Sequence, residues 1–206
     1  MLSNLPLIDI VIVLASLLIS IGIHEAVHAF VAHYLGDTTA AEEGRLSLNP
    51  LKHIDLYTTI LLPAVLMILH LPPIFIAKPV PFDPSRVRYG EYGAAMIAIA
   101  GPLSNFLLAA LGALVLHVGN FGLDGAHIIL LFMMVNVGLF VFNMLPLPPL
   151  DGSRLLYAFA PEPVQKVMYQ IESMGFIMLI VVLLLLAPIL GPFLGNINQA
   201  VLTFLL

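Results

Sequence analysis

Long apolar stretches alternate with short polar ones along the chain, and this pattern predicts a set of membrane-spanning helices. A helix needs about 20 apolar residues to cross a bilayer. Four stretches meet that requirement, at residues 7–35, 93–119, 126–145 and 173–190. The sequence therefore predicts an all-α membrane protein, a polytopic helix bundle of about four full spans.

Two further apolar stretches are interrupted. Residues 56–77 contain Pro63 and end at Pro72 and Pro73, so they form either a full span or a re-entrant or short membrane segment. Residues 191–206 are apolar but broken by glycine and proline, residues 161–171 are amphipathic and suit the membrane interface, and residues 46–50 suit a short strand or an extended loop. We expect one domain over residues 1–206, with a catalytic core at about 7–155 and C-terminal helices at 161–206.

Composition supports the membrane assignment and excludes several kinds of site. Hydrophobic residues make up 61% of the chain and charged residues only 9%, far below the quarter or so typical of soluble domains. The chain has no cysteine, which excludes disulfides, cysteine-ligated metal and a cysteine nucleophile. No basic run is present, so we expect the lipid bilayer and not nucleic acid as a partner.

The first apolar stretch contains a His-Glu-x-x-His motif at His24, Glu25 and His28. Residues four apart on a helix share a face, so both histidines can bind one metal ion, and Glu25 lies beside the first ligand. Ionisable side chains are costly inside a membrane and are kept there mainly for function. The motif therefore predicts a metal site inside the membrane, although histidines merely packed within a bundle are the simpler alternative.

A third ligand is expected at Asp151. Its Asp-Gly turn follows a proline-rich break at the end of the 126–145 stretch, and such a dipeptide is ordinarily only a turn. Three protein ligands with an open position for water is the pattern of catalytic zinc. We therefore predict one Zn²⁺ per chain held by His24, His28 and Asp151, with Glu25 as the base that activates the zinc-bound water.

Three other polar residues are candidates for the site. Asn105 and Asn143 lie within apolar stretches and are candidates to bind substrate backbone or the developing oxyanion, and the sequence does not distinguish between them. A helix-packing role for Asn105 is an equal alternative. His53 is a possible accessory residue, although a loop histidine is the simpler interpretation.

Charge and span number together predict an orientation. The motif and Asp151 must lie near the same membrane face, which requires two crossings between them and so a re-entrant 56–77. All seven basic residues then fall on one side, which the positive-inside rule makes the cytoplasm. We expect a multi-pass protein of the prokaryotic cell membrane, with its active site toward the cytoplasmic side.

Several stretches together resemble the site-2 protease family of intramembrane zinc metalloproteases. They are residues 24–28, 100–105 and 143–152, together with 48–55 and 77–81, which resemble a compact prokaryotic subgroup without a PDZ domain. The resemblance implies zinc binding by His24, His28 and Asp151, catalysis by Glu25, and a transmembrane protein as substrate, cut in or near its membrane segment during regulated intramembrane proteolysis.

Two other functions are compatible with the motif. One is a catalytically silent metal-binding membrane protein, against which the intact Glu25 argues. The other is a divalent-metal transporter, although transporters commonly have paired repeats with ligands in both halves and no repeat is evident here. The sequence leaves the natural substrate and the oligomeric state open.

Overall fold

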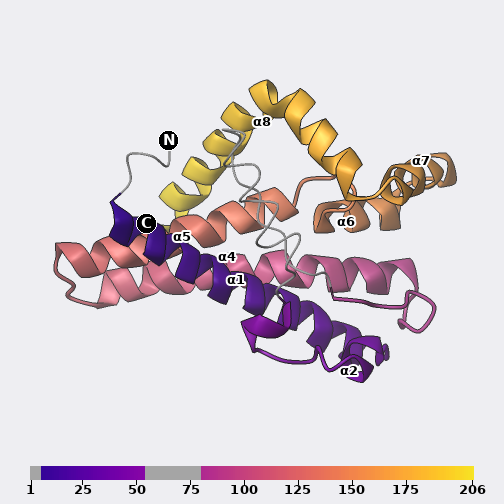
Figure 1. The fold of residues 1–206 in the computed structure, drawn as a ribbon, viewed down its shortest axis with the longest axis horizontal. Coiled ribbons are helices and arrows are strands. Elements are labelled where there is room, and N and C mark those ends of the chain that lie inside the picture. Colours follow the sequence, from indigo (N-terminus) through magenta and orange to yellow (C-terminus); the bar gives the residue numbers. More distant parts are fainter. Residues whose placement is uncertain (1–5, 54–79) are drawn as a thin grey trace.

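The computed structural model describes residues 6–53 and 80–206, and the regular secondary structure of these residues is helical (Figure 1). The elements, in chain order, are α1 (Leu7–Tyr34), α2 (Thr39–Glu42), η2 (Pro50–His53), α4 (Glu91–Val118), α5 (Leu123–Asn143), α6 (Asp151–Phe159), α7 (Glu162–Ser173) and α8 (Phe176–Leu205). The predicted re-entrant segment, 56–77, lies outside the described residues. Residues 46–49 are irregular, as the loop alternative for that stretch predicted.

Four of these helices are long and apolar enough to cross a membrane: α1, α4, α5 and the Met178–Leu205 portion of α8. The predicted class, a polytopic helical membrane protein with four spans, is confirmed. The C-terminal region differs from the prediction, because residues 191–206 continue α8 as a helix through Pro188 and Pro192. Figure 1 shows α8 bent midway, as expected where proline removes a helix hydrogen bond.

The helices α1 and α4 pack side by side and run in opposite directions. The amide of Arg88, just before α4, donates a hydrogen bond of 2.9 Å to the carbonyl of Leu35, just after α1. The end of α1 and the start of α4 therefore lie at the same end of the bundle. This is the arrangement that the two-crossing interpretation requires of the helices on either side of the 56–77 segment.

Asp37 joins the end of α1 to the chain that leads into α4. Its side chain is fully buried, and one carboxylate oxygen accepts hydrogen bonds from the backbone amide and hydroxyl of Thr39. The other oxygen accepts a hydrogen bond of 2.8 Å from the amide of Asp83. A buried carboxylate is tolerated only when it is hydrogen-bonded in this way. The carboxylate of Asp37 thus holds the segment of residues 80–88 against the end of α1.

Basic residues gather at this same end of the bundle. The elements that meet there in Figure 1 are α2, the turn before α4, α6 and α7, and they or their flanking residues contain Arg45, Arg86, Arg88, Arg154 and Lys166. The connection between α4 and α5 lies at the opposite end, where His127 is paired with Asp9 at 2.9 Å. Lys52 belongs with them, since its Nζ donates a hydrogen bond of 3.0 Å to the carbonyl of Gly44, just after α2. The described residues therefore have an asymmetric distribution of basic charge.

We predict that Asp37→Ala destabilises the protein by about 2–3 kcal/mol, because the substitution leaves the part-buried donors of Thr39 and Asp83 without their charged acceptor. Chemical unfolding in detergent micelles measures the change. The matched control is Glu162→Ala, which removes an exposed carboxylate from the first turn of α7 and should cost at most about 1 kcal/mol. Equal losses in the two variants would contradict the proposed role of Asp37.

Candidate metal centre

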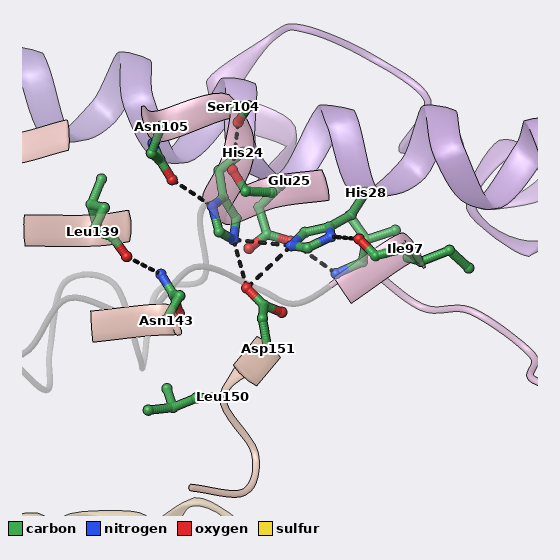
Figure 2. A network of polar contacts seen from close by, with 12 residues as sticks. His24, Glu25, His28, Ile97, Ser104, Asn105, Leu139, Asn143, Leu150 and Asp151 are labelled. Atoms are coloured by element: carbon green, nitrogen blue, oxygen red, sulfur yellow. Dashed lines mark hydrogen bonds and ion pairs between the residues drawn. The ribbon is translucent and has the colours of Figure 1, made fainter. Parts of the chain in front are cut away.

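The helix α1 presents His24 and His28 from one face, one turn apart, toward α4 and α6 (Figure 2). Both side chains are buried, and so is that of Glu25. Figure 2 shows the two imidazole rings pointing toward the same carboxylate, that of Asp151, which is the first residue of α6. The predicted ligands, from opposite ends of the sequence, therefore lie together in the structure.

The turn before α6 places Asp151 at this position. The amide of Leu150 donates to the carbonyl of Leu147 at 2.8 Å, which closes the proline-rich turn after α5. The next residue, Gly152, packs so closely that a Cβ there would lie 2.3 Å from the carbonyl oxygen of Met144. The Asp-Gly pair thus has a structural reason, since only glycine lets the start of α6 approach the end of α5 this closely.

The outer nitrogens of both imidazoles are engaged in hydrogen bonds. Nδ1 of His24 lies 2.6 Å from Oδ1 of Asn105, and Nδ1 of His28 lies 2.8 Å from the backbone carbonyl of Ile97. Both partners are acceptors, so each Nδ1 carries the proton. The two Nε2 atoms face inward. Metal-binding histidines are characteristically oriented by such second hydrogen bonds.

The inner atoms form a set that requires positive charge. The Nε2 atoms of His24 and His28 are 3.0 Å apart, and Oδ2 of Asp151 lies 3.1 Å and 3.4 Å from them. Three atoms with lone pairs repel one another unless a proton or a metal cation lies among them. Ligands bound to zinc at about 2.0–2.1 Å in a tetrahedron would be about 3.3 Å apart. The donor set and its spacing therefore fit zinc.

Gly101 on α4 provides the space beside these ligands. A Cβ at this position would lie 2.2 Å from Nε2 of His28 and 2.7 Å from Nε2 of His24. Because glycine has no side chain, a space remains beside the Nε2 atoms of both imidazoles, and we call this space the cradle. The Gly-Pro pair in the 93–119 stretch indicated close helix contact, and the structure shows that the contact is with His24 and His28 of α1.

Asp151 remains ionised beside the two imidazoles. Burial alone would raise the pKa of its carboxyl group. The neighbouring His28, together with hydrogen-bonding contacts to both imidazoles, outweighs burial, so the pKa of Asp151 is well below its ordinary value. Metal coordination needs the carboxylate in this ionised form.

Glu25 lines a cavity of about 240 Å³ together with His28 and Asp151. Its Oε2 accepts a hydrogen bond of 3.1 Å from the backbone amide of Val80. The apolar part of the wall includes Phe82 and Ile97, and the ion pair of Arg154 with Glu172 also lines the cavity. The carboxylate of the motif therefore shares a partly open cavity with His28 and Asp151.

The remaining candidates occupy different positions. Asn105 is fully buried and bonded to His24, while the side-chain amide of Asn143 donates to the carbonyl of Leu139 at 3.0 Å. His53 is buried with Nε2 2.9 Å from the carbonyl of Ser47, and it is absent from the ligand group found among the described residues. Sequence reasoning missed Asn136 on α5, which bonds to Asn105; a lone asparagine in an apolar span was the available signal.

Comparison with known proteins connects this geometry to a family. The profile of Peptidase family M50 matches residues 121–187, which include Asp151. A Bacillus subtilis (strain 168) protein named "Putative zinc metalloprotease YwhC" is 37% identical over 177 residues, covering 81% of this chain and 77% of its own length. The chain belongs to peptidase family M50, the site-2 protease family.

Two mycobacterial relatives extend the match. Proteins named "Putative zinc metalloprotease Rip2" are 30% identical in Mycolicibacterium smegmatis, over 88% of this chain and 69% of the relative, and 29% identical in Mycobacterium tuberculosis, over 90% and 71%. No solved structure matches the chain. The M50 assignment confirms the family resemblance and the class of metalloprotease, and the predicted zinc cofactor agrees with both the family and the ligand group.

We predict that Gly101→Ala lowers zinc affinity by more than about 100-fold, beyond the roughly 10–100-fold typical of losing an outer hydrogen-bond partner, because its Cβ would fill the cradle. Competition with a chelating dye measures the affinity. Gly138→Ala is the matched control, since it lies within α5 with nothing near its added Cβ, and it should bind zinc as the wild type does. Wild-type affinity in Gly101→Ala would contradict the cradle.

Proposed function

We propose that the protein is an intramembrane zinc metalloendopeptidase that hydrolyses peptide bonds in or near transmembrane segments of membrane proteins. The observation that carries this proposal is the cavity that Glu25 shares with His28 and Asp151. A site used only to bind metal needs no base beside its ligands. This partly open cavity lies beside two membrane-spanning helices, α1 and α4, which suits substrates that reach it through the membrane.

His24, His28 and Asp151 hold the zinc, which when bound lowers the pKa of a coordinated water to about 7 and polarises the scissile carbonyl. Glu25 accepts the proton of the attacking water and passes it to the leaving amine. The hydrogen bond from Val80 to Oε2 fixes the carboxylate and leaves Oε1 available for this transfer.

The two asparagines take different roles in this proposal. Asn105 supports the metal ligand His24, since its carbonyl oxygen is already used there. Asn143 keeps one amide hydrogen beyond the bond to Leu139 and is the candidate to bind the substrate backbone or the oxyanion. His53 remains an accessory candidate only, because its Nε2 is engaged with Ser47.

The basic end of the bundle gives the orientation. Arginine and lysine are enriched on the cytoplasmic side of membrane proteins. The described arginines and Lys166 belong to the end of the bundle where α6 begins, next to the metal ligands. We therefore place the site toward the cytoplasmic side of the cell membrane, where water can reach it, and the connection between α4 and α5 on the other side.

We predict that Glu25→Gln lowers the rate of cleavage of a reconstituted transmembrane substrate by about 10²–10⁴-fold. Its zinc affinity should stay within a few-fold of wild type. The amide keeps the size of the side chain but accepts no proton. Glu91→Gln, an exposed change at the start of α4, is the control and should cleave normally. Undiminished cleavage would refute the base assignment.

The same assay separates the alternative functions. A wild-type protein that binds zinc without cleaving any membrane substrate would be a silent metal-binding protein. Zinc uptake into sealed vesicles would identify a transporter instead.

The orientation can be tested with single cysteines, because the chain has none of its own. We expect Phe121→Cys, between α4 and α5, to react with a membrane-impermeant thiol reagent on intact cells. Glu162→Cys, at the start of α7, should react only after the cells are opened. The reverse pattern would overturn the proposed cytoplasmic placement.

A further inference from the structure

We infer that Asn136 on α5 is a positioning residue for the metal site, which acts on His24 through Asn105. Asn136 and Asn105 are both fully buried. The amide nitrogen of Asn105 donates a hydrogen bond of 3.1 Å to Oδ1 of Asn136, and the carbonyl oxygen of Asn105 lies 2.6 Å from Nδ1 of His24. The inference rests on the proposed metal site but not on proteolysis.

The direction of each amide along this chain follows from its partners. The amide nitrogen of Asn136 donates 2.9 Å to the backbone carbonyl of Phe132, one turn earlier in α5. A carbonyl only accepts, so the nitrogen of Asn136 must face Phe132 and its oxygen must face Asn105. The orientation of Asn136 is therefore set by the helix backbone.

The orientation of Asn105 follows in turn. Its nitrogen must face the oxygen of Asn136, which leaves its own oxygen facing His24. The carbonyl of Ser20 supports the same orientation through a longer contact of 3.4 Å with the same nitrogen. A flipped Asn105 would place its oxygen against two acceptors, which is costly in a buried site.

The last link concerns the tautomer of His24. An acceptor at Nδ1 requires the proton on that nitrogen, so the lone pair lies on Nε2, toward Asp151 and His28. Without Asn136, the Asn105 amide loses its stronger orienting partner, and the opposite tautomer becomes accessible. That tautomer cannot bind a metal through Nε2. Asn136 therefore favours the tautomer of His24 that can bind a metal through Nε2, although Asn136 does not contact His24.

The second ligand lacks such a chain. Nδ1 of His28 donates directly to the backbone carbonyl of Ile97, whose direction is fixed by α4. Both ligands are therefore oriented by a helix carbonyl, His28 directly and His24 through two side-chain amides. Only the His24 branch can be broken by side-chain substitution, which makes it testable.

The test measures zinc affinity in the purified full-length protein by competition with a chelating dye. We expect Asn136→Leu, a substitution of similar size, to weaken zinc binding by about 10-fold or more, within the 10–100-fold range for outer hydrogen-bond partners. Asn105→Leu should weaken it at least as much. The double variant should bind no more weakly than Asn105→Leu alone, because Asn136 acts through Asn105.

The control is Val137→Ala, which removes buried volume at the neighbouring, fully buried position of α5. It should lower the stability of the bundle and leave zinc affinity within a few-fold of wild type. A weakening in Val137→Ala equal to that in Asn136→Leu would show that packing alone matters and would overturn the inference.

Three other results would overturn it. They are wild-type zinc affinity in Asn136→Leu, losses that multiply in the double variant, and failure of both Asn136→Leu and the smaller Asn136→Ser to fold while Val137→Ala folds. Failure of the proposed function has a separate signature, because then the wild-type protein itself binds no zinc or binds it without cleaving a substrate.

Discussion

The structure depends on holding three lone-pair donors together in a largely apolar bundle. His24, His28 and Asp151 place their inner atoms within 3.4 Å of one another, where they would repel each other unless positive charge lay among them. Each imidazole is therefore held by a hydrogen bond at its outer nitrogen, and Asp151 is placed by the backbone turn at which α6 begins. The antiparallel contact of α1 with α4, and the turn that starts α6, supply these restraints.

Three polar side chains at or near the site are each hydrogen-bonded to a backbone group. His28 uses Ile97, Asn136 uses Phe132, and Glu25 uses Val80. Backbone groups in helices are the most rigid partners available, and hydrogen bonds in a low-dielectric interior are strong. The site thereby gains a fixed geometry without a network of exposed charges.

Much of this arrangement was predictable from the sequence. Apolar length predicted the four spans, and helical spacing with an Asp-Gly turn predicted the group of His24, His28 and Asp151 that the structure brings together. The continuous α8 was not predicted, because Gly191, Pro192 and Gly195 suggested a break, although a helix can bend at proline and continue. The partners Ile97 and Asn136 were also not predictable, since a backbone carbonyl carries no sequence signal and the pairing of helices is a tertiary property.

The empty position at Gly101 has a consequence for how this protein can change over generations. Every other amino acid carries a Cβ, so each single-codon replacement of this glycine puts an atom against the two imidazoles. At most positions in a helix bundle a residue can be replaced by another of similar size, but no other amino acid is as small as glycine. We therefore expect residue 101 to remain glycine while other positions of α4 vary, because any side chain there would displace His24 or His28 of α1.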